Sequence, residues 1–194
     1  MTLPKVTLRL TPTTLLVLRR GDLTKFAGDA IVNAANERML GGGGVDGAIH
    51  RAAGPSLLEA CRQVPEVRQG VRCPTGEARM TTGAGLPARN VIHTVGPVYH
   101  NAEASAPLLE SAYRSSLQLA NQHGLKTVAF PAISCGIFGY PFDEAAEIAV
   151  RTCQQEAGQL QEIHFFLFGQ PILDAWLQAA EEAQLQPAEE RQEL

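Results

Sequence analysis

Strand-like and helix-like segments alternate through the second half of the chain, and this alternation limits the fold more than any other feature of the sequence. Residues 126–133 and 163–168 form short apolar runs that predict buried strands. Helices are predicted over 107–123, from Asp143 and from Pro171. Such alternation favours an α/β fold with a largely parallel sheet that is covered by helices on both faces.

The first half supplies further strands, including one pair that need not be parallel. "KVTLRL" and "TLLVLRR" are separated by Pro12 and predict two strands in a hairpin-like arrangement, which would give the sheet a mixed edge. Strands are also predicted at 30–32, in "EARMTT" and in "RNVIHTVGP". Since 45% of the 194 residues are hydrophobic, we expect one domain over residues 1–186, followed by a loose polar tail over 187–194.

The stretch "LGGGGVDGAIHRAAG" joins a glycine run to a predicted helix. Asp46 is a suitable N-cap for a helix that runs to about Ala53, and Gly54 is a suitable end for it. Pro55 suits the first position of a second short helix. Consecutive glycines cost conformational entropy and pack nothing, so the run needs a reason beyond the turn itself.

Two glycine-bearing loops, Gly41–Gly44 and Ser134–Gly139, each follow a predicted buried strand and precede a predicted helix. Ligands of open α/β sheets bind at the carboxyl ends of the strands, so we expect both loops on the same rim. Backbone N–H groups of glycine loops and helix N-termini attract anions. One such loop alone is more often an ordinary turn, but two in matching places predict a cradle for a diphosphate. This ligand also suits a chain of net charge −4 that has no basic patch.

The first loop also matches the G-x-G-x-x-G pattern of dinucleotide-binding sites, through Gly42, Gly44 and Gly47. That pattern should follow its strand at once, yet "NAANERML" intervenes. The acidic partner would be Glu66, which lies in an irregular segment rather than at a strand end. We therefore set the Rossmann interpretation aside and keep the diphosphate ligand.

The second loop carries "AISCG", which is similar to the turn that presents the nucleophile of a serine hydrolase. Asp143 and His164 follow Ser134 in the right order for a triad. His164, however, lies inside an apolar run, where a core or edge-strand histidine is the better interpretation. Cys135 could act as a nucleophile only if the following helix stabilised its thiolate, and we favour a plain loop residue.

The composition excludes several other classes of function. The four cysteines form no CxxC pair and no zinc-like spacing, so we expect reduced thiols, no metal and no cofactor. No leader opens the sequence and no apolar stretch is long enough to span a bilayer, which predicts a cytoplasmic protein without a membrane partner. An acidic pI near 5.7 makes nucleic acid an unfavourable partner. Nothing in the sequence indicates an oligomeric state.

Four segments together resemble a macrodomain of the MacroD type: "GDLTKFAGDAIVNAANERMLGGGGVDGAIHRAAG", "CPTGEARMT", "VIHTVGP" and "FPAISCGIFGYP". The resemblance covers roughly residues 6–177. It implies a three-layer αβα fold with a mixed, largely parallel sheet and a deep cleft for ADP-ribose. It also implies an enzyme that removes mono-ADP-ribose from acidic protein side chains and deacetylates O-acetyl-ADP-ribose.

The resemblance assigns residues to each part of ADP-ribose. Asp22 would accept a hydrogen bond from the adenine amino group, although a cap or turn residue is an alternative, and Leu23 would offer its backbone N–H to the ring. Phe168 matches a position where an aromatic ring packs on adenine, with a core phenylalanine as the alternative. The diphosphate and distal ribose would be lined on one side by Gly43, Gly44 and Val45, and on the other by Ser134, Cys135, Gly136, Ile137 and Phe138.

The resemblance places the reaction at Asp46 and Asn36. Asn36 would hold the distal ribose and orient a water molecule, and Asp46 would accept a proton from that water as it attacks C1 of the ribose. A diphosphate nearby should raise the pKa of Asp46. Asn33 is expected to satisfy loop backbone, and His50 to be structural or to support Asp46 from behind. The alternative function is an ADP-ribose-binding module without turnover, and a pair such as Asn36 and Asp46 argues for the enzyme.

Three residues depart from the family pattern. Cys135 stands where threonine is common, Phe138 where tyrosine is common, and Gly169 where close relatives often have an acid. The first two changes remove a hydroxyl and keep the size of the loop. They therefore affect side-chain hydrogen bonds and leave the backbone cradle in place.

Overall fold

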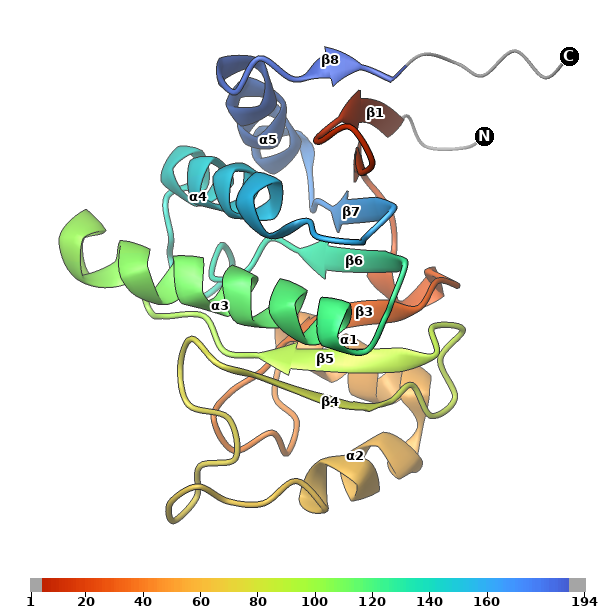
Figure 1. Cartoon of the computed structure of the whole chain (residues 1–194). Coiled ribbons are helices and arrows are strands. Elements are labelled where there is room, and N and C mark those ends of the chain that lie inside the picture. Colours follow the sequence, from red (N-terminus) through yellow and green to blue (C-terminus); the bar gives the residue numbers. More distant parts are fainter. Residues whose placement is uncertain (1–4, 189–194) are drawn as a thin grey trace, which may run out of the picture.

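The computed structural model describes residues 5–188, in which eight strands form one mixed sheet between two layers of helices (Figure 1). The strands are β1 (Lys5–Arg9), β2 (Leu15–Arg19), β3 (Ala30–Ala34), β4 (Ala78–Thr82), β5 (Asn90–Thr94), β6 (Thr127–Pro131), β7 (Glu162–Phe166) and β8 (Gln186–Pro187). The helices are η1 (Leu23–Lys25), α1 (Gly44–Ala53), α2 (Pro55–Arg62), α3 (Ala102–Gln122), α4 (Phe142–Glu156) and α5 (Gln170–Glu182).

The centre of the sheet is parallel and its edges are antiparallel. The strand order is β4-β5-β3-β6-β7-β2-β1-β8. Strands β5, β3, β6, β7 and β2 run parallel, whereas β4 pairs antiparallel with β5, and β1 with both β2 and β8. The predicted mixed, largely parallel sheet and its hairpin-like β1–β2 edge are therefore confirmed.

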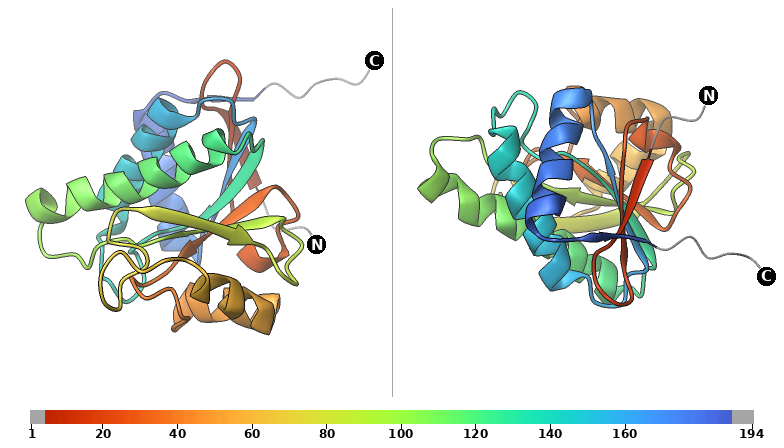
Figure 2. Two further views of the ribbon diagram at one scale, coloured as in Figure 1. Left: turned by 60° about the horizontal axis from the view of Figure 1, so that its bottom comes forward. Right: turned by 90° about the horizontal axis from the view of Figure 1, so that it is seen from above.

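Helices α3, α4 and α5 pack together over one face, and α1 and α2 lie on the other (Figure 2). The strands serve both layers because successive side chains point to opposite faces. In β3, Val32 belongs to the larger cluster under α3–α5, and Ile31 belongs to the smaller cluster under α1 and α2. Strand β5 repeats the pattern with Ile92 and Val91. The apolar runs of the central strands thus reflect burial on both faces.

Three helices begin at residues that differ from the prediction. Helix α1 has Gly43 as its N-cap, so Asp46 lies inside the first turn and does not cap the helix. Helix α4 follows Pro141, so Asp143 also lies in the first turn, where an acid stabilises the helix dipole. Helix α3 begins five residues before Pro107, because the side chain of Asn101 accepts a hydrogen bond from the Ala104 N–H at 2.8 Å.

The chain end is partly tied to the sheet. Pro187, placed in the loose tail by the sequence, belongs to β8, which pairs with β1. The rest of the predicted tail, residues 189–194, lies outside the described residues. None of the helices formed by residues 5–188 is both long and apolar enough to cross a membrane.

Candidate functional site

Two cavities, of about 470 and 400 Å³, meet at the carboxyl ends of the parallel strands. Both volumes lie in the range of small-ligand sites. They share the lining residues Gly44, Val45, Pro131, Ala132 and Gly136, so they form one continuous cleft. We call them the η1 cavity, which reaches Asp22 and Phe168, and the α1 cavity, which reaches Asn36 and Asp46. The cleft lies on the rim that the two glycine loops predicted.

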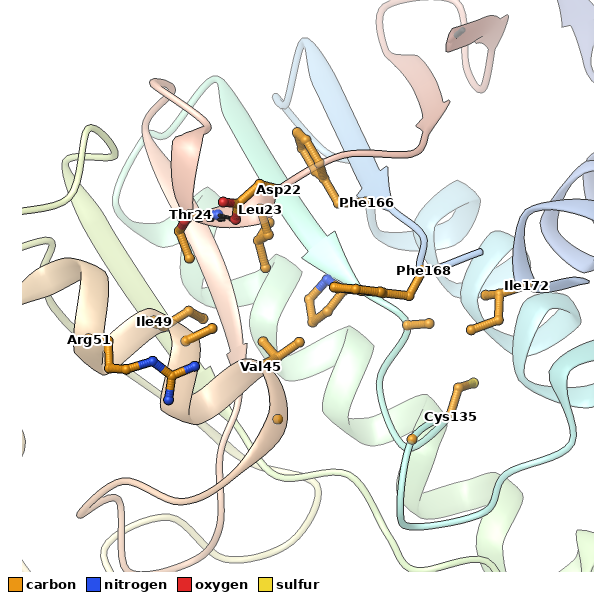
Figure 3. Close-up of a pocket in the computed structure, with 15 residues that line it drawn as sticks. Asp22, Leu23, Thr24, Val45, Ile49, Arg51, Cys135, Phe166, Phe168 and Ile172 are labelled. Carbon is orange, nitrogen blue, oxygen red and sulfur yellow. Dashed lines mark hydrogen bonds between the residues drawn. The ribbon is translucent and has the colours of Figure 1, made fainter. Parts of the chain in front are cut away.

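The η1 cavity is mostly apolar, with polar groups at its edges. Figure 3 shows Val45 and Ile49 of α1 on one side, and Phe168 and Ile172 on the other. Such walls suit a flat aromatic ring. Phe168 is 76% exposed, which excludes the alternative of a plain core phenylalanine. Phe166 is buried and also lines this cavity, a contribution that the sequence analysis missed.

Asp22 combines a capping role with a place at the rim of the η1 cavity. Its Oδ1 accepts hydrogen bonds from the N–H of Thr24 at 3.0 Å and from the Thr24 hydroxyl at 2.7 Å. The expected cap is therefore present, as the N-cap of η1. Neither bond uses Oδ2, so the carboxylate can still accept a hydrogen bond from a ligand.

At two glycines of the cleft, neither the backbone conformation nor a neighbouring atom of the described residues requires glycine. A Cβ built on Gly43 or on Gly136 would meet nothing within 4 Å, and neither residue has a positive φ. Gly47 differs, because its Cβ would stand 2.6 Å from the carbonyl oxygen of Gly42. Gly43 and Gly136 both line the α1 cavity. Glycine at both positions leaves room for a ligand to approach the backbone closely.

Both loops present backbone N–H groups that donate to no backbone carbonyl of residues 5–188. Among the described residues, the N–H groups of Gly42 and Gly43 in the first loop donate to no backbone carbonyl, nor do those of Gly136, Ile137 and Phe138 in the second. Other bonds hold the second loop in shape, from Tyr140 N to the Ser134 carbonyl at 2.9 Å and from Tyr99 N to the Phe138 carbonyl at 2.9 Å. Fixed loops with free N–H groups on both sides of a cavity can bind an anion.

Asp46 presents one carboxylate oxygen to the protein and the other to the cleft. The residue is only 4% exposed. Its Oδ1 accepts a hydrogen bond from Asn33 Nδ2 at 2.9 Å and lies 3.4 Å from His50 Nε2. No described residue hydrogen-bonds Oδ2, which lies beside the first loop, 3.0 Å from where a Cβ on Gly42 would stand. Oδ2 is thus the oxygen that is free to work on a ligand.

Burial raises the pKa of Asp46 above its ordinary value of 3.8. The hydrogen bond from Asn33 and the nearby His50 act in the opposite direction and favour the charged form. This rise is caused by desolvation alone, and the further rise expected from a nearby diphosphate stays a prediction. A carboxylate with a raised pKa is a stronger base than an ordinary aspartate.

The two asparagines of "NAAN" have different hydrogen-bond partners. Asn36 lines the α1 cavity, but its Nδ2 donates to the Gly41 carbonyl at 3.1 Å and its Oδ1 accepts from Met39 N at 3.2 Å. It therefore holds the first loop in shape and has one Nδ2 proton left for a ligand. Asn33 does not satisfy loop backbone, as the sequence suggested, since its amide is bonded to the side chain of Asp46.

The geometry gives no support to a serine or cysteine hydrolase. Ser134 has a strained φ of 65°, but its buried Oγ has no hydrogen-bond partner in residues 5–188 and faces Gly96. His164 instead contacts Glu162 at 3.3 Å and the ring of Phe26. Burial raises the pKa of the Cys135 thiol to about 12, so it carries no thiolate at neutral pH. Across residues 5–188, no group of three or more His, Cys, Asp or Glu side chains is arranged to hold a metal ion.

The structure gathers every predicted site residue around the cleft. The η1 cavity is lined by Asp22, Leu23, Cys135 and Phe168, the α1 cavity by Asn36, Gly43, Asp46, Ser134, Ile137 and Phe138, and both by Gly44, Val45 and Gly136. Arg51 and Ile172 also line the η1 cavity and were not predicted from the sequence. Arg51 lies in the last turn of α1 and on a different side of the helix from Asp46, so helical spacing from Asp46 could not identify it.

Comparison with known proteins agrees with this geometry. The Macro domain family model matches residues 32–149. A macro domain-containing protein of Vibrio parahaemolyticus is 53% identical over 162 residues, which cover 84% of this chain and 95% of that protein. A protein of Escherichia fergusonii named O-acetyl-ADP-ribose deacetylase is 59% identical over 134 residues, which cover 69% of this chain and 75% of that one. The solved Oceanobacillus iheyensis macrodomain with ADP superimposes with a TM-score of 0.88 at 37% identity, and the match covers 95% of this chain and 98% of that one.

Proposed function

The chain belongs to the Macro domain family, and from this premise we propose that it binds ADP-ribose and hydrolyses its esters. The substrates would be mono-ADP-ribose on acidic protein side chains and O-acetyl-ADP-ribose. One observation carries the proposal: a continuous cleft with free backbone donors on both walls ends at a buried carboxylate that has one unbonded oxygen. The Escherichia fergusonii relative is named O-acetyl-ADP-ribose deacetylase, which supports the same substrate class.

The shape of the cleft suggests how ADP-ribose would lie. The η1 cavity takes the adenine, with Asp22 at its rim and Phe168 against the ring. The diphosphate lies between the free N–H groups of the two loops, where Gly43 and Gly136 leave room for it. The distal ribose then reaches Asn36 and Asp46 in the α1 cavity. Backbone dipoles neutralise the diphosphate, which suits a chain of net charge −4.

For an ester whose oxygen is bonded to C1 of the distal ribose, the proposed reaction is an attack of water on C1. The water oxygen forms a bond to C1 while the bond from C1 to the ester oxygen breaks, and the departing group leaves as a carboxylate. Asp46 Oδ2 takes the proton of the attacking water, which its raised pKa favours. A carboxylate needs little protonation to leave, so no strong general acid is required. Asn36 orients the ribose hydroxyls.

A panel of substrates tests this function. ADP-ribose linked through glutamate, serine, arginine, acetate and a terminal phosphate is incubated with the protein, and released ADP-ribose is measured by chromatography. We expect the glutamate and acetate esters to be hydrolysed first, since they have the best leaving groups. If free ADP-ribose binds but none of the linkages is cleaved, the protein is an ADP-ribose-binding module and not an enzyme.

A further inference from the structure

A buried histidine stands directly behind the amide that holds Asp46. His93 is the next-to-last residue of β5, is fully buried, and pairs in register with Asn33 of the neighbouring strand β3. Its Nδ1 is 3.2 Å from Asn33 Nδ2, and its Nε2 is 2.9 Å from the hydroxyl of Thr81 on β4. A line of side chains thus crosses three strands and ends at Asp46 in the cleft. The proposed reaction so far gives His93 no role.

The donors and acceptors along this line fit together in one way. Asn33 must turn its NH₂ toward Asp46, because its oxygen would repel the carboxylate. The same Nδ2 faces His93 Nδ1, so Nδ1 must accept and the proton of the imidazole must lie on Nε2. Nε2–H then donates to the Thr81 hydroxyl, which donates onward to the Thr82 carbonyl at 3.1 Å. Burial lowers the pKa of His93 to about 3, so the ring stays neutral.

The side-chain amide of Asn33 is hydrogen-bonded through its nitrogen but not through its oxygen. Both of its Nδ2 protons are engaged, one by Asp46 and one by His93, while its Oδ1 is buried without a partner in residues 5–188. An unpaired buried carbonyl is costly, and a freely rotating amide would turn to relieve it. The Asp46 carboxylate and the acceptor on His93 both oppose that rotation. The amide is therefore held in the one orientation that donates to Asp46 Oδ1.

We propose that His93 is a positioning residue, which acts through Asn33 to hold Oδ1 of Asp46 and so keeps Oδ2 turned toward the cleft. This inference rests on the proposed function, because the oxygen that it positions is the base of that reaction. The alternative is a purely structural histidine, since Cys61 Sγ is also 3.8 Å from Nε2. A structural role would affect folding but would not act selectively on Asp46.

Three variants separate the two roles. His93→Leu fills the site and removes the acceptor, whereas His93→Asn keeps an amide oxygen near the place of Nδ1. Thr94→Val is the matched control: Thr94 is the next residue of β5, is equally buried, and donates its hydroxyl to the Glu77 carbonyl at 2.8 Å, away from Asp46. Each variant is assayed for kcat, KM, ADP-ribose affinity and thermal unfolding.

We expect His93→Leu to lower kcat by about 10-fold with little change in KM, since a displaced base loses the geometry of attack. His93→Asn should recover most of that loss. Thr94→Val should lower the melting temperature while kcat stays close to that of the unchanged protein. If Thr94→Val lowers kcat as much as His93→Leu does, or if His93→Asn gives no recovery, the role is structural and the proposal is wrong.

Two NMR measurements decide the proposal without any catalytic activity. Nitrogen NMR of labelled histidine in the unchanged protein should show His93 neutral, with its proton on Nε2; a proton on Nδ1 would overturn the proposal even if His93→Leu fails to fold. Carbon NMR of labelled aspartate should show a higher pKa for Asp46 in His93→Leu and an unchanged one in His93→Asn. The other titratable groups near Asp46, His50 and Cys61, are the same in both variants. If the unchanged protein cleaves no ester, the proposed function fails, and these measurements still test the positioning.

Discussion

The two glycine loops occupy matching positions at the ends of neighbouring parallel strands, β3 and β6, but they are supported in opposite ways. Behind the first loop lie polar groups that converge on Asp46. Behind the second lie Tyr140 and Tyr99, whose rings are 4.8 Å apart, and the acids of α4 line neither cavity. The comparison teaches that topology provides two loops with free backbone donors, whereas the proposed chemistry depends on one side chain in the first turn of α1.

This contrast predicts that a change in the first loop's helix removes turnover while binding remains. Asp46→Ala should lower turnover of glutamate-linked ADP-ribose by about 10³-fold, because it removes the proposed general base. The affinity for free ADP-ribose should change by no more than a few fold, since backbone groups and the η1 cavity provide most contacts. Single-turnover kinetics and calorimetry measure the two quantities. Equal losses of turnover and of ADP-ribose affinity would contradict the proposed difference between the two loops.

In the second loop the opposite pattern is expected. Gly136→Val places a side chain in the space left for the diphosphate, so ADP-ribose affinity should fall by about 10- to 100-fold. The protein should stay folded, because a Cβ at Gly136 meets nothing within 4 Å. Gly139→Ala is the matched control: this glycine has a φ of 71° and does not line the cleft, so its replacement should cost stability and spare affinity. Normal affinity in Gly136→Val would show that the ligand does not pass this loop.

The buried charge of Asp46, behind the first loop, should also make the free energy of unfolding depend on pH. Burial raises its pKa, so the folded state holds the proton more tightly than the unfolded chain does. The stability due to this proton is present below the ordinary pKa and is lost as pH rises through the raised one.

Asp46→Asn removes that charge and can still accept from Asn33. We expect its melting temperature at neutral pH to exceed that of the unchanged protein. The increase should be about 2–4 °C for each 1 kcal/mol added to the free energy of unfolding. The difference should shrink in acid, where Asp46 is protonated. Thermal melts at neutral and acidic pH test this, and a gap that widens in acid would contradict it.

The smallest effect is expected at Cys135 of the second loop. Its thiol has a pKa of about 12 and is buried, so it contributes packing rather than charge. Cys135→Ala should weaken ADP-ribose binding by about two- to threefold, as expected for a small loss of contact. At low substrate concentration, turnover should fall by the same factor as the affinity. At saturating substrate, turnover should stay unchanged. A collapse of turnover at saturating substrate would instead place chemistry in the second loop.

The sequence predicted the sheet and the cleft because both depend on local patterns. Apolar runs such as residues 30–32 and the two glycine loops are visible without knowledge of any partner strand. Helix starts were less predictable: Gly43 has no side chain to mark a cap, and Asn101 outweighed Pro107 as the beginning of α3.

The support of the site could not be predicted, because it is made by strand register. Asn33 and His93 are 60 residues apart and become neighbours only when β3 pairs with β5. Read alone, each is a polar residue in an apolar strand. The burial of Asp46 is also a tertiary effect, which follows from the packing of α1 against β3.

The central claim is that water, activated by Asp46 from the first loop, attacks C1 of the distal ribose. The most direct test is hydrolysis of a glutamate-linked ADP-ribosyl peptide in water enriched in heavy oxygen, followed by mass spectrometry of the released peptide. If the bond at C1 breaks, the peptide carboxylate keeps its own oxygens and the peptide mass does not change. A peptide that gains one heavy oxygen would mean attack at the ester carbonyl, and that result would contradict the account.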